Sequence, residues 1–263
     1  MSPSRSDSVL ELHHGSLPLL ISLPHDGTAV PEDIAAHMHD AALRVPDTDW
    51  HVATLYDFAR QLGASILVPR YSRYVIDLNR PPDGAALYPG RAETGLCPLF
   101  GFSGEPLYRE AQAPDAAEVE RRRQRYWQPY HEALQAELAR LKHVHGHALL
   151  WEGHSIRSEV PLLFEGRLPD LNLGTVDGAS CEPARLARVT ELLDQQADYS
   201  WVANGRFKGG YITRHYGQPG AGVNAIQLEL AQLTYMDERS QRYDAVRAGR
   251  LQQLLCKLLQ AAL

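Results

Sequence analysis

The sequence has few of the features that mark secreted, membrane-embedded or nucleic-acid-binding proteins. Its three cysteines, Cys97, Cys181 and Cys256, are widely separated and form no CxxC pair, which argues against a disulfide framework and a cysteine zinc site. No apolar run is long enough to cross a bilayer, and the N-terminus lacks the apolar core of a signal peptide. The net charge is −6, whereas a general nucleic-acid binder normally has a basic face. We therefore expect a cytoplasmic protein that binds neither membrane nor nucleic acid.

The common catalytic signatures are absent as well. The chain contains no GxGxxG, Walker, GxSxG or HExxH sequence. An active site must therefore be assembled from segments that lie far apart in the sequence. The material for a folded core is ample, since 44% of the 263 residues are apolar and 22% are charged. This length and composition predict one α/β domain over residues 1–263.

Short apolar runs that are typical of buried strands alternate with segments of helical periodicity. The predicted strands cover residues 17–23, 65–68, 74–78, 148–151, 171–173, 200–202 and 224–230. The predicted helices cover residues 49–62, 118–143, 183–195 and a leucine-rich segment at the C-terminus. Alternation of this kind indicates a sheet covered by helices on both faces. Residues 81–114 differ, because their many glycines and prolines predict a long ordered loop excursion.

Two histidines lie at the ends of predicted strands, where an open α/β sheet exposes functional groups. His25 follows the first predicted strand and His154 follows the run 148–151. A single histidine at a turn is usually a solvated residue, but the matching positions favour a metal-binding pair. A hydrolytic zinc site takes three protein ligands, so a carboxylate is also needed. Asp47 and Asp49 lie where a loop enters a predicted helix, and helix capping would explain one of them but less readily both.

Two further segments carry groups suited to a small anionic substrate. Asn79 and Arg80 follow a predicted strand, and an arginine fork can hold a carboxylate through two hydrogen bonds. A surface salt bridge is the alternative role for this arginine. Gln227 and Glu229 share one face of another predicted strand. A carboxylate within an apolar strand needs a partner or a task, and partial burial would suit Glu229 to act as a general base.

Several motifs resemble those of the N-formylglutamate amidohydrolase family. They are residues 24–27 (PHDG), 47–51 (DTDWH), 73–80 (RYVIDLNR), 154–158 (HSIRS), 163–175 (LFEGRLPDLNLGT) and 209–230. The resemblance extends over nearly the whole chain. It implies a metal-dependent deformylase of histidine degradation that releases formate and L-glutamate. It also implies a fold similar to the zinc carboxypeptidases, a three-layer α/β sandwich with a mixed, mostly parallel sheet.

The resemblance also implies a site for one Zn²⁺ ion. His25 and His154 would be ligands. The zinc carboxypeptidases take a glutamate ligand three residues after the first histidine, and this chain has Thr28 there. We therefore infer that Asp49 is the third ligand, with Asp47 as the alternative. Glu152 stands where we expect an aspartate in relatives, and the longer carboxylate there could still support a metal ligand.

The remaining roles follow from the same resemblance. Glu229 would be the general base, and Arg73 would stabilise the oxyanion. The residues implied in substrate binding are Asn79, Arg80, Ser155, Arg157, Arg214, Tyr216 and Gln227. Asn79 and Arg80 would hold one carboxylate of the substrate, and Arg157 or Arg214 would hold the other.

Two other functions stay open. The chain could be another zinc-dependent N-acyl amino acid amidohydrolase or a carboxypeptidase-like enzyme. It could also be a non-catalytic anion-binding protein with a degenerate metal site, although all the proposed ligands and the base are present. For the deformylase, the partner is a small dicarboxylate substrate.

Overall fold

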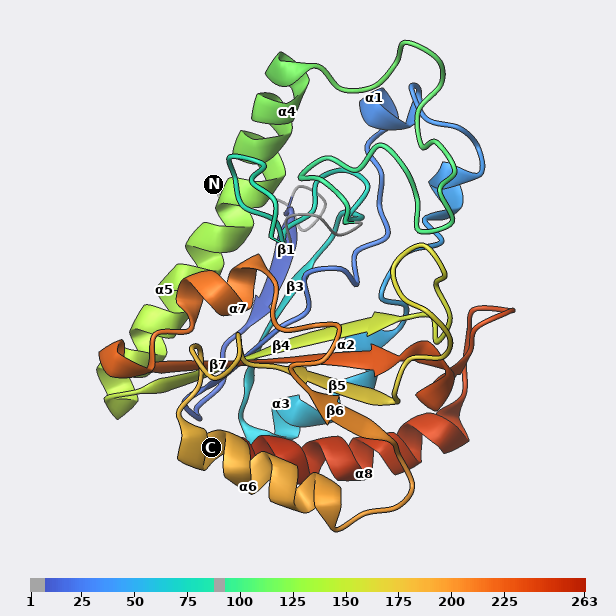
Figure 1. Cartoon of the computed structure of the whole chain (residues 1–263). Coiled ribbons are helices and arrows are strands. Elements are labelled where there is room, and N and C mark those ends of the chain that lie inside the picture. Colours follow the sequence, from blue (N-terminus) through green and yellow to red (C-terminus); the bar gives the residue numbers. More distant parts are fainter. Residues whose placement is uncertain (1–7, 88–92) are drawn as a thin grey trace.

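The computed structural model describes residues 8–87 and 93–263; residues 88–92 of the predicted loop excursion and residues 1–7 lie outside this description. A seven-stranded sheet forms the middle of the molecule, in the order β1-β3-β2-β4-β7-β5-β6 (Figure 1). Its strands are β1 (Leu10–His13), β2 (Leu19–Ser22), β3 (Ser65–Pro69), β4 (Ala148–Ile156), β5 (Leu171–Gly174), β6 (Trp201–Ala203) and β7 (Val223–Ala231). Two short strands, β8 (Met236–Asp237) and β9 (Arg242–Tyr243), pair only with each other among the described residues.

The sheet is mixed and mostly parallel, as predicted. Strands β3, β2, β4 and β7 run parallel to one another, and so do β5 and β6. Strand β1 is antiparallel to β3, and β5 is antiparallel to β7. The carboxyl ends of β2, β4 and β7 therefore meet at one edge of the sheet, where α/β proteins place their ligands. The similarity to zinc carboxypeptidases stays a prediction.

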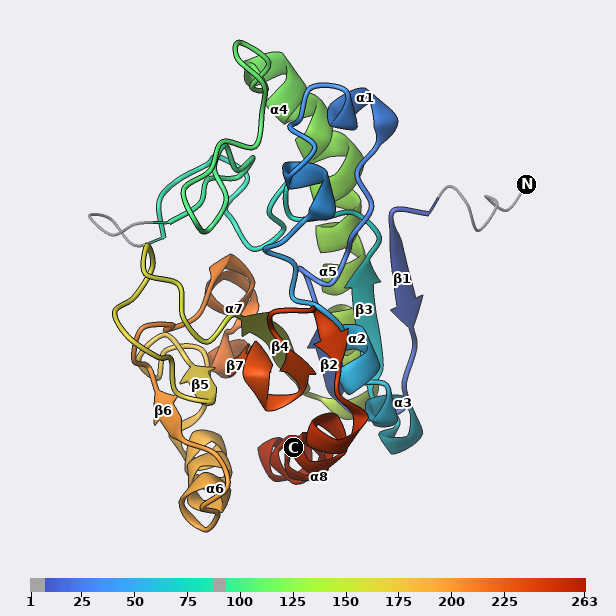
Figure 2. The same ribbon diagram turned by 90° about the vertical axis from the view of Figure 1, so that its right-hand side faces the viewer.

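Helices cover both faces of the sheet, which gives three layers (Figures 1 and 2). One face is covered by α2 (Val52–Leu55), α3 (Phe58–Leu62), α6 (Pro183–Asp194) and α8 (Ala245–Ala262). The other is covered by α5 (Gln128–His145) and α7 (Tyr211–Tyr216). Helix α4 (Ala116–Arg122) and the π-helical turn η2 (Arg123–Trp127) lead into α5, and both α4 and α1 (Glu32–Ala35) lie beyond the strand ends (Figure 1). Three 3₁₀ turns are η1 (Ala42–Arg44), η3 (Pro219–Ala221) and η4 (Gln232–Thr234). In the described part of the chain, no helix is both long and apolar enough to cross a membrane.

The strands divide their side chains between two cores because successive residues point to opposite faces. Leu149 and Trp151 of β4 belong to the same apolar cluster as residues of α6 and α8, whereas Leu150 belongs to the cluster of α5. Local sequence sets the helix ends. Helix α5 stops at Gly146, whose φ of 78° suits glycine, and α8 begins after Asp244, whose carboxylate accepts two backbone N–H bonds.

The predicted strand over residues 74–78 is wrong. This segment is a buried series of turns, in which the N–H of Val75 donates to the carbonyl of Ser72 (2.9 Å) and that of Asp77 donates to Leu96 (2.7 Å). Its apolar side chains fill the core beside α5, so the run looks like a strand in sequence. A short apolar run indicates that its side chains are buried, but it does not by itself define the backbone conformation.

The other predicted elements are present, but several bounds differ. Strand β4 extends to Ile156, so His154 lies within this strand and not after it. The predicted helix over residues 49–62 is the pair α2 and α3, which are separated at Tyr56 and Asp57. The predicted helix over residues 118–143 is confirmed, and it is longer because α4, η2 and α5 form one helical rod over residues 116–145. Strand β1 was not predicted, since four residues at a sheet edge give too little alternation to recognise.

Candidate metal centre and active site

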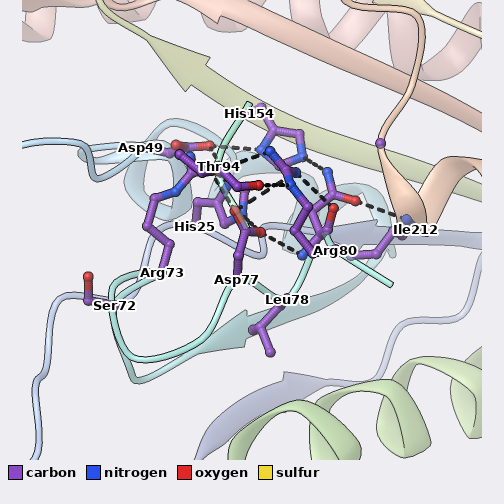
Figure 3. A network of polar contacts seen from close by, with 12 residues as sticks. His25, Asp49, Ser72, Arg73, Asp77, Leu78, Arg80, Thr94, His154 and Ile212 are labelled. Carbon is purple, nitrogen blue, oxygen red and sulfur yellow. Dashed lines mark hydrogen bonds and ion pairs between the residues drawn. The ribbon is translucent and has the colours of Figure 1, made fainter. Parts of the chain in front are cut away.

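The edge where β2 and β4 end brings two histidines and one aspartate together. His25 follows β2, His154 lies near the end of β4, and Asp49 lies in the loop before α2. One ligand atom from each residue lies within 4.8 Å of the others, and all three side chains are buried. His154 Nδ1 is 2.9 Å from Asp49 Oδ2, and His25 Nδ1 is 3.8 Å from the same oxygen (Figure 3). This is the trio that we inferred as metal ligands from the sequence.

The opposite nitrogen of each histidine is held by a carboxylate. His25 Nε2 is 2.7 Å from Asp77 Oδ1, and His154 Nε2 is 2.7 Å from Glu152 Oε1. Glu152 is itself held by the backbone N–H of Thr213 (3.0 Å) and by the hydroxyl of that residue. Metal-binding histidines commonly donate their second N–H to a carboxylate, which fixes the ring and its tautomer. Both Nδ1 atoms therefore face the position that a metal would take.

The donor set fits a catalytic zinc site. It offers two imidazole nitrogens and one carboxylate oxygen, and such sites keep a fourth position for water or substrate. Asp47 lies outside this cluster, because its Oδ2 accepts the hydroxyl of Tyr74 (2.6 Å) and the N–H of Phe102 (2.7 Å). The alternative ligand considered in the sequence thus anchors a loop, and Asp49 is the carboxylate in position.

The local charges keep His25 suited to binding a cation. Its pKa is lowered, first by burial and then by the charge of Arg73, so the imidazole is neutral. Arg73 Nη1 is 3.3 Å from His25 Nδ1, which must then accept, while Arg73 Nη2 donates to Asp77 Oδ2 (2.7 Å). Burial alone would raise the pKa of Asp77, but His25 and Arg73 hold it well below its ordinary value. Asp77 is therefore ionised, and it can orient both the Arg73 guanidinium and the His25 imidazole.

Glu229 lies beside this cluster on the neighbouring strand. It stands opposite His154 in the parallel register of β4 and β7, and both residues line the same cavity. Burial raises the pKa of Glu229 to about 8. Within the described residues, no hydrogen-bond donor contacts its carboxylate. A carboxylate with a raised pKa beside a metal site is suited to accept and return a proton.

The cavity is open to solvent, and its empty space, which includes open solvent, is about 640 Å³. Of the residues predicted to bind substrate, Asn79, Arg80, Ser155 and Gln227 line it, and so does Arg73. The Arg80 guanidinium donates to the carbonyl of Thr94 (2.7 Å) and to its hydroxyl (3.1 Å). Loop residues 93, 94 and 102 form part of the wall, so the predicted loop excursion does border the site where it is described.

Three residues predicted to bind substrate lie elsewhere. Arg157, Arg214 and Tyr216 are not among the described residues that line the cavity. Arg157 Nη2 is 3.7 Å from Asp47 Oδ1, Arg214 donates from Nε to the carbonyl of Gly209 (2.9 Å), and the hydroxyl of Tyr216 is 3.0 Å from His131 Nδ1.

Sequence reasoning missed Arg206, which does line the cavity. Its Nε donates to the carbonyl of Leu163 (2.8 Å), and its guanidinium lies 5.3 Å from the centroid of the Phe207 ring. The signal that could have found it is its place in a glycine-rich stretch, residues 204–210, since loops of this kind often carry binding residues.

The comparisons with known proteins decide the family. The model of the N-formylglutamate amidohydrolase family matches residues 17–236. The chain belongs to this family. It is 52% identical over 258 residues to an N-formylglutamate deformylase of Pseudomonas putida, covering 98% of this chain and 96% of that protein. It is 56% identical over 234 residues to an N-formylglutamate deformylase of Pseudomonas aeruginosa, covering 89% and 88%. These matches identify the protein as an enzyme, a hydrolase of amide bonds.

Solved structures support the same family and fold. The crystal structure of an N-formylglutamate amidohydrolase from Ralstonia eutropha matches with a TM-score of 0.82 and 26% identity, over 96% of each chain. A gene product from Agrobacterium tumefaciens matches with a TM-score of 0.70 over 98% of each chain. Its 18% identity shows a shared fold alone.

Proposed function

We propose that this family member hydrolyses N-formyl-L-glutamate to formate and L-glutamate, with one divalent metal ion that we take to be zinc. The observation that supports the proposal is a single cavity in which the trio of His25, Asp49 and His154 adjoins Glu229 and three arginines. The high identity to two proteins named N-formylglutamate deformylase supports this substrate. In this role the enzyme would act in the last step of histidine degradation, in the cytoplasm.

The metal would be held by His25 Nδ1, His154 Nδ1 and a carboxylate oxygen of Asp49. A bound zinc ion would lower the pKa of water toward about 7 and would polarise a carbonyl oxygen. Asp77 and Glu152 keep the two imidazoles in the ligating tautomer through their Nε2 atoms. The chain thus supplies both the ligands and the groups that orient them.

The proton is moved by Glu229. Its carboxylate would take a proton from the attacking water and deliver it to the nitrogen of the departing glutamate. The raised pKa of about 8 makes this carboxylate a stronger base than an ordinary glutamate. The guanidinium of Arg73 is buried and rigidly held by Asp77, so it would stabilise negative charge that develops on the formyl oxygen.

The substrate carries two carboxylates, and three arginines, Arg73, Arg80 and Arg206, line the cavity. Arg80 would hold one carboxylate, with Asn79 as a neighbouring donor, and Arg206 would hold the other. Gln227 and Ser155 line the remaining wall, and the side-chain oxygen of Gln227 accepts from the N–H of Gly210 (2.7 Å). This replaces the assignment of the second carboxylate to Arg157 or Arg214, because neither is among the described residues lining the cavity.

The direct test is formate release from N-formyl-L-glutamate by the purified protein. We expect turnover that is lost after treatment with a chelator and restored by adding zinc. Elemental analysis before and after treatment would show whether one ion per chain accompanies activity. Full activity in chelated protein with no detectable metal would refute the metal-dependent mechanism. No formate release from metal-loaded protein would refute the substrate.

A further inference from the structure

The turn that carries Asn79 and Arg80 lies outside the sheet, so its buried carbonyls need donors from other elements. Two side chains of the helical rod supply them. Trp127 Nε1 donates to the carbonyl of Arg80 (3.0 Å), and His131 Nε2 donates to the carbonyl of Leu78 (2.9 Å). The two rings stack with their centroids 3.7 Å apart. One helix face thus holds the carbonyls immediately before and after the Asn79-Arg80 pair.

The His131 bond requires one particular tautomer, and Tyr216 supplies the group that selects it. Nε2 can donate to Leu78 only if the ring hydrogen is on that nitrogen, which leaves Nδ1 as an acceptor. The hydroxyl of Tyr216 lies 3.0 Å from Nδ1 and can donate to it. Burial lowers the pKa of His131 to about 3, so the ring stays neutral. The hydroxyl, the imidazole and the carbonyl therefore form one directed chain of hydrogen bonds.

Helix α7 holds the same turn through a second contact. The backbone N–H of Ile212 donates to Asn79 Oδ1 (2.9 Å), which leaves Asn79 Nδ2 directed toward His154 Nε2 at 3.0 Å. A shift of the turn would therefore move the Asn79 amide relative to a candidate metal ligand. It would also move Arg80 relative to the cavity wall. Trp127 ends a π-helical turn, and such turns are frequent at functional sites, which supports a functional role for this part of the helix.

We propose that Tyr216, His131 and Trp127 are positioning residues that fix the Leu78–Arg80 backbone, so that Asn79 and Arg80 meet the substrate in the correct place. The proposal rests on the proposed function. It gives Tyr216 a role in substrate binding that acts through the turn and not by contact with the substrate.

The chain offers a matched pair of variants for the test. Tyr216→Phe and Tyr130→Phe each remove one phenolic hydroxyl, and Tyr130 is adjacent to His131 in sequence but bonds Ser22 (2.8 Å) and not the turn. We expect Tyr216→Phe to raise KM for N-formyl-L-glutamate roughly three- to tenfold, the worth of one hydrogen bond, with kcat within about twofold. Tyr130→Phe should leave KM unchanged. Equal KM values in the two variants would overturn the proposal.

A second pair addresses the imidazole directly. In His131→Gln the amide can still donate to the Leu78 carbonyl, whereas His131→Leu removes the donor. We expect the glutamine variant to have a KM closer to wild type than the leucine variant, with equal zinc content in both. If the leucine variant does not fold, Trp127→Phe takes its place, because it removes the donor to Arg80 and retains a stacked ring. Wild-type KM in the donor-lacking variant would contradict the proposal.

Amide hydrogen exchange separates this proposal from the proposed function. The peptide that contains residues 77–80 should exchange faster in Tyr216→Phe than in Tyr130→Phe, whatever the substrate. If wild-type protein releases no formate and the exchange still differs in this way, the proposed function fails and the positioning of the turn stands. If wild-type protein is active and the two variants match in both KM and exchange, the positioning role fails and the function stands.

Discussion

The two buried faces of β4 and β7 are built on opposite principles. Toward α6 and α8 the strands present apolar side chains, which are Leu149, Trp151, Ile226, Leu228 and Leu230. Toward α5 and α7 they begin with Leu150 and Ala225 and then turn polar, with Glu152, His154, Gln227 and Glu229. All of these residues are less than 9% exposed. Burial is therefore equal on the two faces, while the chemistry is not.

Under the proposed function, the apolar face serves stability and the polar face serves catalysis. Burying apolar side chains stabilises the fold without further conditions. Burying carboxylates and imidazoles costs free energy unless each finds a partner, and here partners such as Asp77 for His25 and Thr213 for Glu152 meet that need. Glu229 lacks a hydrogen-bond donor among the described residues, so its burial costs free energy, and this fits the general-base role that we propose for it.

Removing a ligand from the polar face should have the largest effect. We expect His25→Ala and His154→Ala to lose bound zinc and to reduce turnover to background, because two remaining ligands cannot hold a three-ligand site. Elemental analysis and circular dichroism would show metal loss in a protein that stays folded. Stoichiometric zinc in either variant would contradict the ligand assignment.

Replacing the base should reduce turnover while sparing the metal. In Glu229→Gln the shape is retained and the proton acceptor is lost, so kcat should fall by roughly 10²- to 10⁴-fold with zinc content unchanged. The measurement is steady-state formate release together with elemental analysis. Near-native turnover would assign Glu229 a structural role.

Changing Arg80, which we propose holds a substrate carboxylate, should have a smaller effect that depends on the substrate. Arg80→Lys keeps the charge but loses the planar fork, so kcat/KM for N-formyl-L-glutamate should fall about 10- to 100-fold, as expected for hydrogen bonds between charged groups. Arg157→Lys is the matched control, because Arg157 is not among the described residues that line the cavity, and it should change little.

A substrate panel sharpens the same point. Wild-type protein should favour N-formyl-L-glutamate over N-formyl-L-methionine, since the latter leaves one of the partly buried arginines, Arg80 or Arg206, without its carboxylate. It should also favour the formyl over the acetyl derivative, because Phe102 is buried at the cavity wall with its ring centroid 4.8 Å from the Arg73 guanidinium. Equal rates on the neutral formylated substrate would point to a general N-acyl hydrolase.

The polar face was largely predictable from sequence, and the reasons are physical. His25, His154 and Glu229 stand out because charged or ligating groups interrupt apolar runs, and parallel strands bring such interruptions to one edge. Asp49 could not be separated from Asp47 until the structure showed Asp47 bonded to Tyr74 and to the Phe102 N–H. A two-residue spacing in a loop does not reveal which carboxylate points inward.

The surrounding loops were less predictable. Arg157, Arg214 and Tyr216 lie in the right motifs, but the direction of a side chain outside regular structure depends on distant contacts. Arg206 was missed for the same reason. The segment over residues 74–78 was assigned as a strand because its burial comes from α5 and not from sheet pairing. Tertiary contacts thus decide the backbone conformation of a short apolar run and the direction in which a loop arginine points.

The smallest expected effect is on stability, and it has a definite dependence on pH. In metal-free protein the pKa of Glu229 is raised from an ordinary 4.5 to about 8. The folded state therefore holds a proton that the unfolded state releases between these values, and the stability of the wild type should fall as pH rises through this window. Glu229→Gln does not titrate. The melting temperature of Glu229→Gln relative to that of wild type should therefore rise from pH 5 to pH 8. The rise should be about 2–4 °C for each kcal/mol of unfolding free energy that the wild type loses.

Leu228 provides the control from the opposite face of the same strand. Leu228→Ala removes buried apolar volume and should destabilise the fold by roughly 2–5 kcal/mol at every pH, since no titrating group is involved. Thermal melts of the three proteins at pH 5, 6.5 and 8, after removal of metal, would measure both effects. A constant offset between wild type and Glu229→Gln across this range would show that Glu229 is ionised in the folded protein throughout. In that case the contrast between the two faces would lie in their chemistry alone and would carry no cost in stability.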